Sequence, residues 1–163
     1  MNALHDQSQD HDLDLLNASL ELALAQCEDL APAIFARFFA RCPAATDLFT
    51  VPDAAMPPLG CGQMVFEIIS LLLDSAAGKP YVASYMHQIA SEHCTFKVED
   101  ATLYSEFMAA LVDVLADLLG ARWSPAYAHA WERQSKRLLE SLPAPALAGM
   151  RGSGNCQHRQ PAL

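Results

Sequence analysis

The residue with the clearest potential for chemistry in this sequence is His93, near the end of the stretch 81–98, which reads YVASYMHQIASEHCTFKV. An apolar stripe at intervals of three and four residues leads to it, formed by Val82, Tyr85 or Met86, Ile89 and His93. In a helix this spacing turns the imidazole toward the core. Such an imidazole is either a hydrogen-bonded core residue or a ligand of a metal or cofactor, and position alone favours the first.

The other histidines and the cysteines do not complete a metal site with His93. His87 lies six residues earlier, about 120° away around a helix, so the two cannot bind one ion from a straight helix. The spacing also differs from that of zinc proteases, whose helical ligands stand four residues apart. The five cysteines show no CxxC pair, which indicates reduced thiols rather than disulfides or structural zinc.

Length and composition predict one globular domain, since the chain has 163 residues of which 52% are apolar. A formal charge of −9 without a basic stripe argues against a nucleic-acid partner. Acidic residues interrupt the most apolar runs, 64–73 and 107–119, so no membrane association is expected. The first residues lack the basic and apolar regions of a signal peptide, and we expect a cytoplasmic protein.

The periodicity predicts an all-α domain over 12–142, between a flexible N-terminal segment, 1–11, and a disordered tail, 143–163. Six or seven helices are expected, near 12–28, 31–42, 43–49, 61–76, 81–93, 101–119 and 124–142. Prolines in the first turns, Gly120 as a C-terminal cap and Ser124 as an N-terminal cap mark the breaks. Three prolines make 50–60 a long loop.

Three segments within 12–142 resemble the globin family, specifically the bacterial single-domain haemoglobins. FFARCPAATDLF, with Phe39, Pro43 and Phe49, resembles the globin segment in which an aromatic helix leads to a short helix that opens with proline and closes on a haem-packing phenylalanine. HCTFKV resembles the end of the proximal helix, with His93 in the place of the iron ligand and Lys97 replacing the family's glycine. LGARWSPAYAHAW is similar to the start of the last helix.

The resemblance implies a globin-like fold of six to eight helices around a pocket for haem b, the iron protoporphyrin. His93 would be the metal ligand, Phe49 would touch the macrocycle and Phe35 would lie over the distal side. The implied pocket residues are Phe35, Phe49, Cys61, Gln63, Met64, Val65, Ile89, His93 and Val98. These residue types suit a flat apolar disc held through an imidazole. We expect Phe38 and Phe39 to be core residues.

The distal residue is one of three candidates on the helix 61–76. Counting back from His93 places Cys61 opposite the iron, but the loop before it leaves the register open by two or three residues. We favour Gln63, because its amide would donate a hydrogen bond to bound oxygen. Met64 would instead pack against the ligand or coordinate iron as a sixth ligand.

Two departures from the flavohaemoglobins, which convert nitric oxide to nitrate, favour ligand binding over catalysis. Phe35 stands where those enzymes carry a distal tyrosine, and we expect no reductase domain after the globin. Tyr104 matches their proximal tyrosine, but Pro143 ends the last helix before their glutamate could follow.

We therefore expect reversible binding of a diatomic gas, oxygen first and then NO or CO, in oxygen transport or gas sensing. The alternatives are a haem enzyme of nitric oxide or peroxide chemistry served by an external reductase, and a haem-free globin-like regulatory or interaction module. We also leave open whether the chain forms a homodimer.

Overall fold

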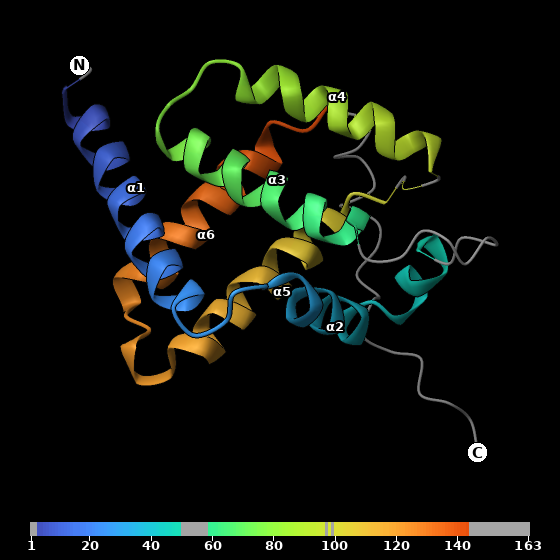
Figure 1. Ribbon diagram of the computed structural model, residues 1–163. Coiled ribbons are helices and arrows are strands. Elements are labelled where there is room, and N and C mark those ends of the chain that lie inside the picture. The colour runs from blue at the N-terminus through green and yellow to red at the C-terminus, as the bar shows by residue number, and fades with distance from the viewer. Residues whose placement is uncertain (1–2, 50–58, 97, 99, 144–163) are drawn as a thin grey trace.

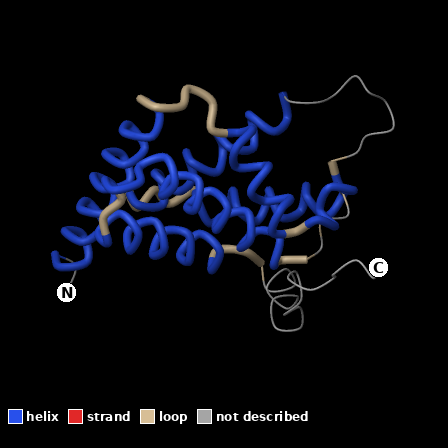
Figure 2. Tube along the Cα trace, turned by 90° about the horizontal axis from the view of Figure 1, so that it is seen from below, coloured by secondary structure: helices blue, strands red, loops and turns tan. Residues whose placement is uncertain are grey.

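The chain folds into helices throughout the part that the structure describes (Figure 1). This computed structural model describes the backbone of residues 3–49, 59–96, 98 and 100–143, and their side chains except at 3–10, 59 and 60. The helices are α1 (Ala3–Leu24), α2 (Ala31–Arg41), the 3₁₀ helix η1 (Pro43–Leu48), α3 (Leu59–Ala76), α4 (Val82–Thr95), α5 (Thr102–Leu119), the 3₁₀ helix η2 (Gly120–Arg122) and α6 (Pro125–Glu140). Within these ranges there is no strand (Figure 2), which confirms the all-α prediction.

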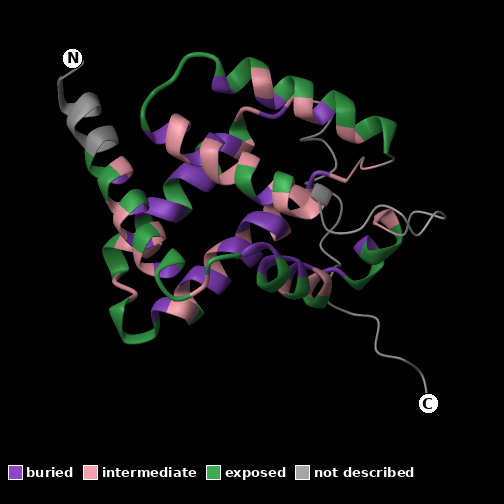
Figure 3. Ribbon diagram, viewed as in Figure 1, coloured by how far each residue is buried: buried purple, intermediate pink, exposed green. Residues whose placement is uncertain are grey.

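The most extensive helix contacts join α2 to α5 and α1 to α6, and α3 packs against α6, α1 and α2. α4 lies beside α3 and runs in the opposite direction (Figure 1). The buried positions lie on the sides that the helices turn toward one another, whereas α4 is largely exposed on its outer side (Figure 3). α4 is therefore an outer helix, and its inner face packs against the core.

The start of α2 and the turn into η1 follow from proline. The helix carries Pro32 in its first turn, and Asp29 Oδ1 accepts a hydrogen bond of 3.0 Å from the Ala31 amide. Pro43 opens η1 directly after α2 ends, and Phe49 closes it with its amide on the Thr46 carbonyl. These boundaries confirm the predicted order.

Cap residues separate α5 from α6. Gly120 follows α5 with φ of 50°, a backbone conformation that side chains with a Cβ rarely adopt. Ser124 Oγ accepts a hydrogen bond of 3.2 Å from the Tyr127 amide, and Pro125 begins α6. Both predicted caps are confirmed.

Some predicted boundaries do not hold. The first helix begins at Ala3 and not at the predicted start, Asp12. Residues 3–11 contain neither proline nor glycine, and nothing in their sequence stops a helix. α3 begins at Leu59, two residues before the predicted start. The rest of the predicted loop, and the tail beyond Pro143, lie outside the described residues.

The buried face of α1 differs from the predicted leucine stripe. Leu16 is buried, but Leu24 is 45% exposed, and Leu13 and Leu20 are half-buried. The buried side chains follow Asp12, Leu16, Ser19 and Ala23 instead. Ser19, a polar residue of this face, is bound to α6, because Trp131 Nε1 donates a 2.8 Å hydrogen bond to Ser19 Oγ.

Asp12 joins three helices through a buried polar network. Its carboxylate accepts hydrogen bonds from both Nε (3.1 Å) and Nη2 of Arg133, and from Gln134 Nε2 at 2.9 Å. Gln134 Oε1 in turn accepts a 3.3 Å hydrogen bond from Ser75 Oγ on α3. Burial by itself raises the pKa of Asp12, but the hydrogen bonds from Arg133 and Gln134 and the charge of Arg133 lower it below its ordinary value.

We expect Asp12→Ala to destabilise the fold by about 2 kcal/mol at neutral pH, because it leaves Gln134 and Arg133 without their acceptor. Asp14→Ala is the matched control, since Asp14 is exposed on the same helix, and should change stability by less than about 0.5 kcal/mol. Urea unfolding of both variants measures the difference.

The cost of losing Asp12 should also depend on pH. Because its pKa is lower in the folded chain, its contribution is present above the ordinary value of 3.8 and is lost as pH falls through the folded-state value. The difference in free energy of unfolding between wild type and Asp12→Ala should therefore become smaller as the pH falls. A difference that stays constant until the protein unfolds in acid would contradict this role.

Candidate functional site

His93 lies on the inner face of α4, near the end of the helix. Val82, Met86 and Ala90 of this face are buried, and Ile89 and His93 are half-buried. His87, which the sequence places away from this face, is exposed. The predicted inward stripe is confirmed, and it carries the imidazole toward the core.

One ring nitrogen of His93 is held by the helix itself. Nδ1 lies 2.9 Å from the carbonyl oxygen of Ile89, one turn earlier. A carbonyl oxygen only accepts hydrogen bonds, so Nδ1 must carry the proton. In the neutral imidazole the lone pair is then on Nε2, the nitrogen farther from the helix backbone. This is the tautomer that a metal ligand requires.

The end of α4 fixes the backbone of His93. Its carbonyl oxygen accepts hydrogen bonds of 3.0 Å from the amides of both Phe96 and Val98. This pattern closes a helix C-terminus and brings the residue after the turn back over the last turn. Val98, a predicted pocket residue, is half-buried there. Lys97, which replaces the family's glycine, lies outside the described residues.

Tyr104 of α5 packs against the imidazole. The two ring centroids are 5.4 Å apart with an interplanar angle of 48°. Burial, with a smaller contribution from Cys94, raises the pKa of Tyr104 to about 12. The phenol therefore stays neutral beside His93. Cys94 follows His93 in the sequence, and we predicted from this position that it would be a packing residue, but the structure shows it exposed.

The predicted phenylalanines form one aromatic cluster with a member that the sequence did not single out. Phe35 lies in edge-on or tilted contact with four rings: Phe38 at 6.5 Å, Phe39 at 5.7 Å, Phe49 at 5.3 Å and Phe107 at 5.3 Å between centroids. Phe107 stands three residues after Tyr104, so the two share one face of α5. This face links the cluster to His93. The spacing of the apolar residues over 101–119 was enough to predict that Phe107 faces the core.

The three distal candidates lie on different sides of α3. Val65 is buried, and Cys61 and Met64 are half-buried and pack against the core. Gln63 is exposed, as expected for a residue about 200° around the helix from Cys61. The structure thus brings Cys61, Met64 and Val65 to the inner face but not Gln63. Burial raises the pKa of Cys61, so its thiol is neutral near pH 7.

The start of α3 and the end of α4 lie at the same end of the antiparallel pair (Figure 1). Cys61 is in the first turn of α3 and His93 is in the last turn of α4. This arrangement places the neutral thiol and the imidazole at one end of the pair, on the inner faces of two neighbouring helices.

Comparison with known families agrees with this geometry. The model of the globin family matches residues 32–142, which run from the first turn of α2 past the end of α6. The chain belongs to the globin family. A search of curated proteins found no significant match. In the described part of this globin, no helix is long and apolar enough to cross a membrane.

The side chains of this globin fit the haem group that the family carries. Half-buried apolar side chains of α3, α4 and α5 pack against the core: Cys61, Met64, Ile68, Ile89, Leu103 and Tyr104. Among the described residues no group of three histidine, cysteine, aspartate or glutamate side chains could hold a bare metal ion. Haem brings four nitrogen ligands of its own, so a single imidazole is enough to hold it in a protein.

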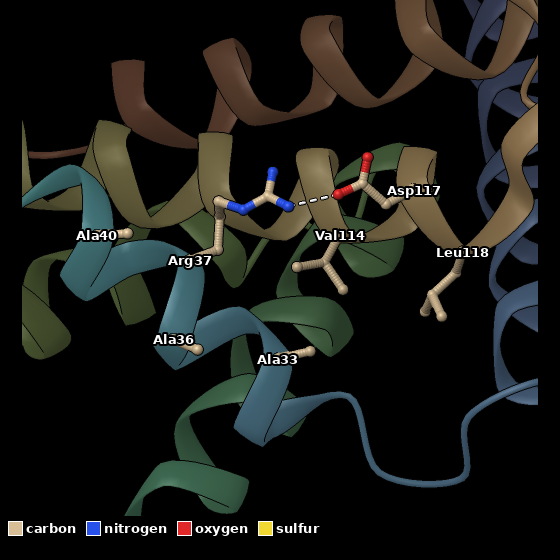
Figure 4. A pocket seen from close by; sticks show the side chains of 7 residues that line it. All are labelled: Ala33, Ala36, Arg37, Ala40, Val114, Asp117 and Leu118. Atoms are coloured by element: carbon tan, nitrogen blue, oxygen red, sulfur yellow. Dashed lines mark hydrogen bonds and ion pairs between the residues drawn. The ribbon is translucent and has the colours of Figure 1, made fainter.

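A separate groove of about 330 Å³ lies between α2 and α5 of the globin (Figure 4). Its walls are small or apolar, and the ion pair between Arg37 and Asp117 spans it. The lining residues are Ala33, Ala36, Arg37, Ala40, Val114, Asp117 and Leu118. None of the predicted site residues is among them, so this groove is separate from the predicted pocket.

We expect Phe35→Ala to cost about 3 to 4 kcal/mol of stability, because it removes the ring that contacts four others in the cluster. Phe66→Ala makes the same chemical change at a side chain that is 70% exposed, and should cost less than about 0.5 kcal/mol. Chemical unfolding of the two variants gives the comparison. Equal losses would show that the cluster is not a packed unit.

Proposed function

We propose that this globin binds haem b through Nε2 of His93 and reversibly binds a diatomic gas, oxygen before NO or CO. The observation that carries the proposal is the hydrogen bond from Nδ1 to the Ile89 carbonyl, which leaves Nε2 with its lone pair. Haem, when bound, supplies an iron with a further coordination position at which small diatomic molecules bind. The family match supports the cofactor but leaves the gas open.

The role of Ile89 is to orient the imidazole. A histidine that donates its second nitrogen to a carbonyl keeps one tautomer and one ring orientation, and its ligating nitrogen becomes more basic. Tyr104 limits rotation of the same ring from the side of α5. Together these two residues hold Nε2 ready before any cofactor binds, which lowers the entropy cost of forming the bond.

The role of the aromatic cluster is to exclude water. Phe35 is 5% exposed and is in contact with Phe49, the residue that we propose to lie against the macrocycle. Among the described residues that we propose for the distal side, Phe35, Cys61, Met64 and Val65, none carries a charge or a strong hydrogen-bond donor. This environment supports reversible binding over the nitric oxide and peroxide chemistry that we considered as the alternative.

Cys61 is the distal residue that the burial pattern favours over Gln63. It lies on the inner face of α3 and its raised pKa keeps the thiol protonated. A thiol is only a weak hydrogen-bond donor. We therefore propose modest stabilisation of bound oxygen and correspondingly fast release. Met64, also half-buried, is the remaining alternative on the same helix.

His93→Ala should abolish haem binding or change its absorption spectrum grossly, because the protein loses its nitrogen ligand. His87→Ala is the matched control, since His87 is an exposed histidine of the same helix, and it should bind haem as the wild type does. Haem titration followed by ferric and ferrous spectra measures both, and added imidazole should partly restore the His93→Ala spectrum. An unchanged His93→Ala spectrum would remove His93 from its proposed role.

Cys61→Gln should slow oxygen dissociation about tenfold, since an amide donates a stronger hydrogen bond than a thiol. Gln63→Ala should leave the rate unchanged within about twofold, because Gln63 is exposed. Stopped-flow displacement of oxygen by carbon monoxide measures both rates. A large change with Gln63→Ala and none with Cys61→Gln would reverse the assignment.

A further inference from the structure

Two tyrosines of the α4 region hydrogen-bond to two carboxylates of α3. The Tyr81 hydroxyl donates to Asp74 Oδ2, and the Tyr85 hydroxyl donates to Glu67 Oε1. The two phenol rings also contact each other edge-on, with centroids 6.3 Å apart and an interplanar angle of 70°. We name these four residues the tyrosine clasp. Hydrogen bonds to an ionised acceptor are about twice as strong as those between neutral groups.

The clasp joins α3 and α4 at the end opposite to His93. Between the two helices the chain turns at Gly78, whose φ is 67°, and the Lys79 amide donates a 2.9 Å hydrogen bond to the Asp74 carbonyl. Tyr85 then lies eight residues before His93, which is about 12 Å along a helix. The clasp therefore holds the first half of α4, and the proposed iron ligand lies at the far end.

The clasp supplies directional contacts between α4 and the rest of the fold. Its two hydrogen bonds join the start and the first half of α4 to α3. Val82, Met86 and Ala90 bury apolar surface against the core, but apolar contacts are not directional and allow a helix to slide or rotate. A helix of 14 residues is also marginal without tertiary contacts. Directional bonds are needed to fix its register.

Helix geometry connects the clasp to the ring of His93. Tyr85 and Ile89 are four residues apart and are neighbours on the surface of α4. The Ile89 carbonyl accepts the hydrogen bond from His93 Nδ1. A shift of α4 along or around its axis would move this carbonyl, and with it the imidazole. The position of Nε2 thus depends on where the clasp holds the helix.

We propose that Tyr81 and Tyr85 are positioning residues that hold α4 against α3 and thereby set the point from which His93 reaches iron. This inference rests on the proposed function, since it assumes that His93 binds haem. The tyrosines contact neither iron nor ligand in this role. They act through the placement of the helix.

The double variant Tyr81→Phe/Tyr85→Phe tests the proposal, because it keeps both rings and removes both hydroxyls. We expect it to release haem to a haem-free acceptor globin about tenfold faster than the wild type and to shift the iron–histidine stretching band in the ferrous Raman spectrum. In the haem-free chain, backbone amides of α4 should exchange with deuterium faster, while those of α1 and α6 stay unchanged. Tyr127→Phe, on α6, is the control.

A second pair of variants separates positioning from general destabilisation. Glu67→Gln keeps an oxygen that accepts from Tyr85 and should retain most of the wild-type haem retention, whereas Glu67→Ala should behave like Tyr85→Phe. The clasp is disproved if the double variant matches the wild type in haem release, Raman band and α4 exchange. Failure of the proposed function is a different result, in which the wild-type chain itself takes up no haem, and that result would overturn both proposals.

Discussion

The structure of the site depends on the hydrogen bond from His93 Nδ1 to the Ile89 carbonyl. Both groups belong to one helical turn, so α4 places them within reach of each other. It determines which nitrogen carries the proton and which has a lone pair. The helix end reinforces it, because the Phe96 and Val98 amides hold the His93 carbonyl. A single local bond thereby leaves Nε2 as the ring nitrogen with a lone pair.

The remaining helices hold this turn in place. α5 carries Tyr104 against the imidazole and Phe107 in the aromatic cluster, so one rigid element connects both sides of the proposed pocket. Farther away, the buried carboxylate of Asp12 joins α1 to α6 and, through Gln134, to α3. The Asp12 network lies on helices other than α5, so Asp12 can be substituted without changing a residue of the proposed pocket.

Local signals predicted most of the fold and the inward stripe of α4 that ends at His93. Pro43, Gly120 and Ser124 act within a few residues of themselves, and each marks the boundary that the structure has. The distal residue could not be predicted in the same way, because the loop before α3 leaves the register of this helix open. Gln63 was favoured over Cys61 only because an amide is the better hydrogen-bond donor. The pairing of Asp12 with Arg133, 121 positions apart, and the tyrosine clasp depend on tertiary packing that periodicity does not encode.

The central claim is that Nε2 of His93 binds the iron of haem. The most direct measurement is an anomalous difference map at the iron absorption edge from crystals of the haem-loaded chain. The claim predicts an iron peak within bonding distance of Nε2, with Nδ1 still on the Ile89 carbonyl. An iron peak beside another residue, or a His93 ring packed among side chains with no porphyrin next to it, would contradict it.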